Sequence, residues 1–149
     1  MSNKPLCACH DGESPCAFHR AYQVTGRLGK GGMGAVYQAR QRSTGRNVAI
    51  KFMLHTGCAD DRARFDAETR ALVALQHPHV LSIVDAGCIG DRPYLVTELM
   101  SGGTLRARMP PGQRQSPGFA CETIGQVLSG LAACHRAGIV HRDVKPENI

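Results

Sequence analysis

The chain has 149 residues, 42% of them hydrophobic and 20% charged, which is enough for one ordinary globular domain. Its formal net charge is +6, but the Lys and Arg residues are scattered and not interleaved with aromatic residues, which argues against a nucleic-acid-binding protein. No apolar run is long enough for a membrane helix, and the N-terminus lacks the apolar core of a secretory signal, so we expect a cytoplasmic protein with no membrane segment in this chain.

The first twenty residues differ in composition from the rest. They contain Cys7, Cys9, His10, Cys16 and His19, and such closely spaced side chains could close a tetrahedral Zn²⁺ site, with Cys7, Cys9, Cys16 and His19 as the candidate ligands. Their spacing matches no defined zinc module, so the alternative is a disordered polar tail that happens to carry these residues. The sequence therefore indicates that residues 1–20 are a separate Cys/His-rich segment, which is either a zinc site or a disordered tail.

A glycine-rich loop follows a strand-like segment, Tyr22 to Leu28. Gly29, Gly31 and Gly34 are spaced so that backbone amides can approach an anionic ligand with no Cβ in the way. A dinucleotide-binding fold shares such glycines but needs a helix to begin at the last of them. Residues 36–40 instead alternate like a strand. We therefore predict a glycine loop between two antiparallel strands, lying over phosphates.

A lysine in an apolar strand is the next candidate. Lys51 lies within residues 47–53, and an unpaired ammonium there is costly to bury. Residues 60–75 have the apolar spacing of a helix, with Glu68 on the same stripe as Phe65 and Leu72. A carboxylate on this inward stripe needs a cation, and Glu68 is therefore the candidate acid for an ion pair; the alternative is that Glu68 and Lys51 are both solvated surface charges.

The middle of the chain predicts two more strands and two helices. The strands lie around residues 80–87 and 93–98, and a glycine-containing step at 101–103 follows them. A short helical turn is expected over 105–109. Ser116 and Pro117 are a typical helix start, and this helix should run to about Ala137, with Gly138 as its stop.

The last nine residues, 141–149, combine three kinds of chemistry. The carboxylate of Asp143 can accept a proton from an attacking hydroxyl. The ammonium of Lys145 can neutralise a transferring phosphoryl group, and the side-chain oxygen of Asn148 can ligate Mg²⁺.

These segments together resemble the N-terminal half of a protein kinase catalytic domain, and the Gly-Gly-Met-Gly loop and Lys-Pro-Glu-Asn ending are most similar to bacterial Ser/Thr kinases. The resemblance implies an α+β, two-lobe fold for residues 21–149. A complete antiparallel β small lobe with one helix would occupy about 21–100, and a truncated helical large lobe would begin at 101–149. It also implies ATP-dependent phosphoryl transfer to Ser and Thr hydroxyls of proteins, with ATP and Mg²⁺ as cofactors.

The resemblance assigns roles to individual residues. Lys51, held by Glu68, would bind the α and β phosphates; Asp143 would be the base, Lys145 would stabilise the phosphoryl group, and Asn148 would ligate Mg²⁺. The residues that would surround the nucleotide are Leu28, Gly29, Gly31, Gly34, Val36, Ala49, Lys51, Thr97, Glu98 and Met100.

The sequence departs from the kinase pattern at its end, because it contains no Asp-Phe-Gly, the source of the main Mg²⁺ ligand in kinases. We therefore expect a fragment of a larger domain that does not transfer phosphate by itself. A pseudokinase or nucleotide-binding scaffold is the alternative function, and an interaction protein built around the Cys/His segment is another. The intact Lys51, Asp143 and Asn148 favour the enzyme.

Overall fold

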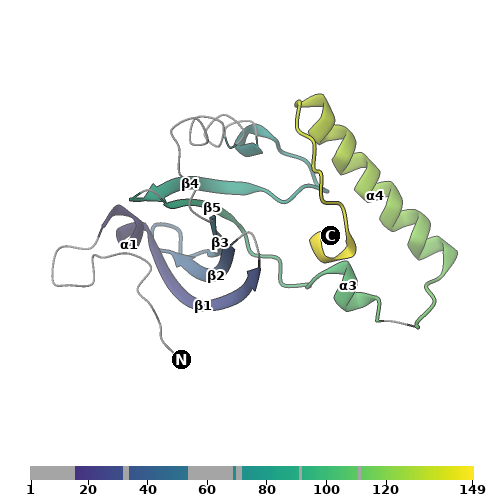
Figure 1. Cartoon of the computed structure of the whole chain (residues 1–149), viewed down its shortest axis with the longest axis horizontal. Coiled ribbons are helices and arrows are strands. Elements are labelled where there is room, and N and C mark those ends of the chain that lie inside the picture. The colour runs from purple at the N-terminus through teal and green to yellow at the C-terminus, as the bar shows by residue number, and fades with distance from the viewer. Residues whose placement is uncertain (1–15, 32–33, 54–68, 70–71, 91, 111) are drawn as a thin grey trace. The chain divides into compact units, whose positions relative to one another are not determined.

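The computed structural model describes residues 16–31, 34–53, 69, 72–90, 92–110 and 112–149. The chain divides into two compact units, one made of residues 1–62 and 83–99 and the other of residues 63–82 and 100–149. Figure 1 shows the helices and strands of both units. Of the helix predicted over residues 60–75, only Thr69 and residues 72–75 are described, and Thr69 and residues 72–74 are helical.

The first unit contains a five-stranded sheet in the order β1-β2-β3-β5-β4, with every neighbouring pair antiparallel. The strands are β1 (Tyr22–Gly31), β2 (Gly34–Gln41), β3 (Asn47–Met53), β4 (Ile83–Ile89) and β5 (Arg92–Glu98). The five predicted strands are confirmed. β1 continues through the first glycines to Gly31, and β4 begins later than expected, at Ile83.

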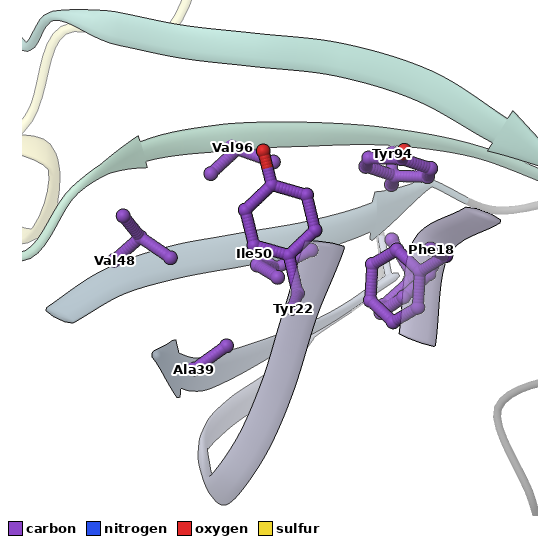
Figure 2. Close-up of a cluster of buried hydrophobic side chains, with 8 residues drawn as sticks. Phe18, Tyr22, Ala39, Val48, Ile50, Tyr94 and Val96 are labelled. Atoms are coloured by element: carbon purple, nitrogen blue, oxygen red, sulfur yellow. The ribbon is translucent and has the colours of Figure 1, made fainter. Parts of the chain in front are cut away.

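The two faces of this sheet have different surroundings. Along β3, Val48, Ile50 and Phe52 are buried, whereas Ala49 and Lys51 are only partly buried. This period of two is expected for a strand whose alternate side chains point to opposite faces. Figure 2 shows the buried side, where the core also includes residues from the neighbouring strands, among them Ala39, Tyr94 and Val96.

A short helix, α1 (Ala17–Ala21), packs against this core through Phe18. Phe18 is 3% exposed, and its ring centroid lies 5.0 Å from that of Tyr94 and 5.6 Å from that of Phe52. These are normal separations for edge-to-face aromatic pairs. The sequence predicts a boundary after residue 20, but α1 crosses that position and contributes Phe18 to the core of the sheet.

A hydrogen bond joins the two edge strands of the sheet. The hydroxyl of Tyr22, on β1, donates to Oδ2 of Asp85, on β4, over 2.6 Å. Because β1 and β4 are at opposite ends of the strand order, the sheet must curl until its edges approach each other at this point. Burial, and then the hydrogen bond to Asp85, raise the pKa of Tyr22 well above its usual value.

We expect the sheet to lose stability at alkaline pH because of Tyr22. A phenol with a raised pKa in the folded state contributes stability that is complete below its unfolded value of about 10 and is lost as the pH rises above it. Urea unfolding between pH 8 and pH 11 should therefore show a falling midpoint. The fall should be smaller in Tyr22→Phe, and an equal fall in both proteins would rule out this role for Tyr22. Burial also raises the pKa of Tyr94, so part of the fall should remain in the variant.

The second unit contains the helices α3 (Leu105–Arg108) and α4 (Pro117–Arg136) and a 3₁₀ turn, η2 (Pro146–Asn148). Oγ of Ser116 accepts from the amide of Phe119 over 3.2 Å, and Gly138 has a φ of 75°, so the predicted start and stop of the long helix are confirmed. On α4, Ile124 and Leu128 remain 58% and 60% exposed. In the described part of the chain, no helix is both long and apolar enough to cross a membrane.

The segment around His77 and His79 packs closely on α4. The side chain of His77 lies with Nε2 3.3 Å from Oγ of Ser129, and the next helical residue, Gly130, is buried. A Cβ on Gly130 would lie 2.5 Å from the carbonyl oxygen of His79. Glycine is therefore needed here for close approach of two backbones and not for its flexibility.

Two glycines on α4 should respond oppositely to alanine. Gly130→Ala should destabilise the second unit by about 1–3 kcal/mol, because the helix and the His79 backbone must move apart. Gly125→Ala, with nothing within 4 Å of its Cβ, should stabilise the helix by about 0.5–1 kcal/mol. Thermal unfolding followed by circular dichroism at the helix band measures both, and a stabilised Gly130→Ala protein would contradict this packing.

Candidate active site

The register of the sheet gathers four of the predicted nucleotide-contacting residues on one face. Val36 pairs directly with Lys51, and Ala49 pairs directly with Thr97. Direct partners in an antiparallel sheet point to the same side, and positions 49 and 51 of β3 do as well. Val36, Ala49, Lys51 and Thr97 therefore lie on the face opposite to the hydrophobic core.

The glycine loop forms the hairpin between β1 and β2, in which Gly31 pairs with Gly34. A strand, not a helix, follows Gly34, which excludes the dinucleotide-binding arrangement. Gly34 has a φ of 133°, and a Cβ there would overlap the carbonyl oxygen of Phe52. The backbone of β2 thus approaches β3 as only glycine allows.

Three of the residues predicted to surround the nucleotide, Thr97, Glu98 and Met100, are at or near the end of β5. Thr97 donates a hydrogen bond from Oγ1 to the carbonyl oxygen of Glu98 over 3.0 Å. Met100, the first residue of the second unit after β5, is 65% exposed, and Leu28, on β1, is 51% exposed. Their contacts with a nucleotide remain predictions.

The predicted partner of Lys51 lies outside the described residues. Glu68 belongs to the undescribed range 54–68, so the ion pair between Lys51 and Glu68 stays a prediction. Lys51 itself is partly buried on β3.

The second unit brings the three polar residues of the terminal loop together. Nζ of Lys145 lies 2.8 Å from Oδ2 of Asp143. Nδ2 of Asn148 donates to the same Oδ2 over 2.9 Å and to the backbone carbonyl of Asp143 over 2.8 Å. The amide of Asp143 lies 3.3 Å from Nδ1 of His141. The predicted base is thus the centre of a local hydrogen-bond network.

This network keeps Asp143 ionised. The hydrogen bond from Lys145, and after it the one from Asn148, hold the pKa of Asp143 below its usual range. The same contact raises the pKa of Lys145. At neutral pH the loop therefore presents a carboxylate, which can accept a proton, beside an ammonium, which can stabilise negative charge.

The residues of the loop also suit Mg²⁺. Asn148 directs its amide nitrogen at Asp143, which leaves its carbonyl oxygen as the atom for a hard cation. Mg²⁺ in nucleotide enzymes commonly combines one or two protein oxygens with phosphate oxygens. A group of three or more His, Cys, Asp or Glu side chains that could hold a metal is absent from the described residues.

One polar contact of this loop was not predicted from the sequence. Nε of Arg106, on α3, lies 2.8 Å from Oε1 of Glu147, and this ion pair lowers the pKa of the Glu147 carboxyl. The two residues are far apart in the chain and belong to no shared motif, so only their charges could have suggested the pair.

Comparison with known proteins agrees with this geometry. A family model described as the protein kinase domain matches residues 22–149. The chain is 45% identical over 133 residues to the serine/threonine-protein kinase pkn2 of Myxococcus xanthus, covering 86% of the chain and 16% of that protein. It is 40% identical over 130 residues to PknL of Mycobacterium tuberculosis, covering 86% of the chain and 33% of that protein.

A crystal structure of a mutant form of the PknI kinase domain from Mycobacterium tuberculosis has a similar fold, with a TM-score of 0.78 and 26% identity. The match covers 86% of the chain and 53% of the solved chain, so the kinase fold extends over most of this chain but over only about half of that structure. The chain spans a third or less of the two curated relatives. With the glycine hairpin, the lysine strand and the Asp143 loop all in place, residues 22–149 belong to the protein kinase domain family.

Proposed function

We propose that the protein containing this chain transfers the γ-phosphoryl group of ATP to Ser or Thr hydroxyls of other proteins. The observation that carries the proposal is the Asp143 network, in which a carboxylate is held within 2.8 Å of Lys145 and 2.9 Å of Asn148. The names of the relatives, which are serine/threonine-protein kinases, support the same reaction and acceptor class.

In this reaction, the hydroxyl oxygen of the acceptor forms a bond to the γ-phosphorus, and the bond from that phosphorus to the bridging oxygen of ADP breaks. Asp143 orients the hydroxyl and takes its proton, while Lys145 stabilises negative charge on the transferring group. The backbone of the glycine hairpin covers the phosphates, and Lys51 binds the α and β phosphates. Mg²⁺, held in part by Asn148, would neutralise the phosphate oxygens.

Phosphotransfer from γ-labelled ATP to a Ser/Thr protein substrate tests the proposal in the longer parent protein. Asp143→Asn should lower kcat by about 10²–10⁴-fold, because it removes the proton acceptor but keeps the shape of the side chain. Glu122→Gln, which removes an exposed carboxylate from α4, is the matched control and should leave the rate unchanged. Equal rates for Asp143→Asn and the control would refute the proposed role.

The same assay separates the enzyme from the alternative, a pseudokinase or nucleotide-binding scaffold. A scaffold would bind an ATP analogue, and Lys51→Met would weaken that binding, but the unmodified protein would transfer no phosphate. The 149-residue chain by itself should give no transfer above background. Transfer by the isolated chain that Asp143→Asn abolishes would overturn this last expectation.

Zinc binding by Cys7, Cys9, Cys16 and His19 stays a separate hypothesis, since Cys7 and Cys9 lie outside the described residues. Sγ of Cys16 lies 3.3 Å from Nδ1 of His19, so these two atoms are close enough to coordinate the same metal ion. The zinc content of the purified protein should exceed that of the variant with Ser at positions 7, 9 and 16. Equal metal content in both proteins would end the hypothesis.

A further inference from the structure

The loop that carries Asp143 is attached to α3 at two points. Nε of Arg106 lies 2.8 Å from Oε1 of Glu147, and the amide of Leu105 donates to a backbone oxygen of Ile149 over 2.6 Å. Figure 1 shows the C-terminal turn, drawn in yellow, beside α3. These contacts surround Asn148, since one anchors the residue before it and the other the residue after it.

Both sides of this attachment are locally constrained. On α3, Oγ1 of Thr104 accepts from the amide of Ala107, which caps the start of the helix that carries Arg106. In η2, Pro146 restricts its own φ, and the amide of Asn148 donates to the carbonyl of Lys145 over 2.9 Å. A displacement of Glu147 should therefore also displace Asn148, the next residue in the same 3₁₀ turn.

Asn148 in turn holds the base. Its Nδ2 donates to both Oδ2 and the backbone carbonyl of Asp143. A chain of contacts thus runs from Arg106 through Glu147 and Asn148 to Asp143.

We propose that Arg106 is a positioning residue of the phosphotransfer site: by holding Glu147 it keeps Asn148 within hydrogen-bonding reach of Asp143. The inference rests on the proposed function for its meaning, because it presumes that Asp143 and Asn148 act on ATP and the acceptor. In this proposal Arg106 acts through its ion pair with Glu147.

The neighbouring Arg108 provides the comparison that isolates this role. Arg108 lies on the same short helix and carries the same charge, but it lines an open cavity of about 300 Å³ beside Phe119 and Glu122 and makes no ion pair with the loop within the described residues. A general effect of charge or helix stability should therefore be similar for the two arginines, whereas an effect through Glu147 should appear only for Arg106.

The test is NMR of the 149-residue chain, with Arg106→Gln, Glu147→Gln, Arg108→Gln and the charge exchange Arg106→Glu with Glu147→Arg. Two NMR signals report on the loop. The side-chain amide protons of Asn148 are hydrogen-bonded to Asp143, and the backbone amide proton of Leu105 is hydrogen-bonded to Ile149. In Arg106→Gln and Glu147→Gln these protons should exchange with water roughly two to five times faster, the range expected for losing an exposed ion pair.

Arg108→Gln should leave the exchange unchanged, and the charge exchange should restore it at least in part. The inference is wrong if Arg106→Gln and Arg108→Gln give the same exchange rates, or if the charge exchange behaves like the single variants while helix content stays the same. Since no nucleotide or phosphotransfer enters the measurement, its outcome is independent of the assay that tests the proposed function.

Discussion

Replacing Phe18 by alanine should destabilise the sheet unit by about 3–5 kcal/mol. Phe18 is 3% exposed and packs against the rings of Tyr22, Phe52 and Tyr94, so its removal leaves a cavity where the core is most aromatic. Urea unfolding followed by tyrosine fluorescence measures the effect. The chain has three tyrosines and no tryptophan, and all three tyrosines lie on strands of the sheet, so the signal reports this unit.

Arg20→Ala is the control for Phe18→Ala, since Arg20 is exposed on the same helix. Its unfolding midpoint should stay close to that of the unmodified protein. Phe18→Leu, which keeps most of the apolar volume, should fall between the two. If Phe18→Ala unfolded at the same urea concentration as Arg20→Ala, Phe18 would have no part in the core.

Gly34→Ala should have the second large effect, a loss of roughly 3 kcal/mol together with much weaker binding of an ATP analogue. The backbone at Gly34 has a φ of 133°, which an alanine adopts only with strain, and the new Cβ would overlap the carbonyl oxygen of Phe52. The alanine would have to push β2 away from β3 at the end of the hairpin next to Lys51.

Gly29→Ala tests whether this effect belongs to Gly34 or to any glycine of the hairpin. Gly29 does not have a positive φ, and nothing lies within 4 Å of the place where its Cβ would be, so alanine should fit there with a change of at most about 1 kcal/mol. Tyrosine fluorescence again reports unfolding, and a fluorescent ATP analogue reports binding. Equal losses of stability in the two variants would show that close backbone contact at Gly34 is not the cause.

Local patterns predicted most of the sheet. The alternation around Lys51 and the turn residues between strands depend on neighbours in the chain, and β3 has the bounds that the sequence indicated. Phe18 could not be predicted in this way, because it precedes the first strand and its partners, Phe52 and Tyr94, lie on distant strands. The same holds for Tyr22 and Asp85, which meet only because the sheet curls.

The candidate site also contains some contacts that the local sequence predicts and others that depend on the tertiary fold. Asp143, Lys145 and Asn148 are close in the sequence, so their hydrogen bonds follow from one short loop and its motif. The pair of Arg106 and Glu147 depends on how α3 packs beside η2, which no local pattern encodes. The sequence does not predict the contact between Gly130 and the His79 backbone either. A glycine within a helix usually indicates low helix propensity, and not close packing against another segment.

The alternation along β3 has a consequence for how this protein can change during evolution. Positions that hold the fold together and positions that would bind nucleotide are interleaved, with Ile50 on one side and Lys51 on the other. An inserted residue that slid the strand by one place would bury the ammonium and turn the isoleucine outward. Insertions in the turn before β3 should therefore survive only where the extra residue bulges out and leaves the strand in step with its neighbours.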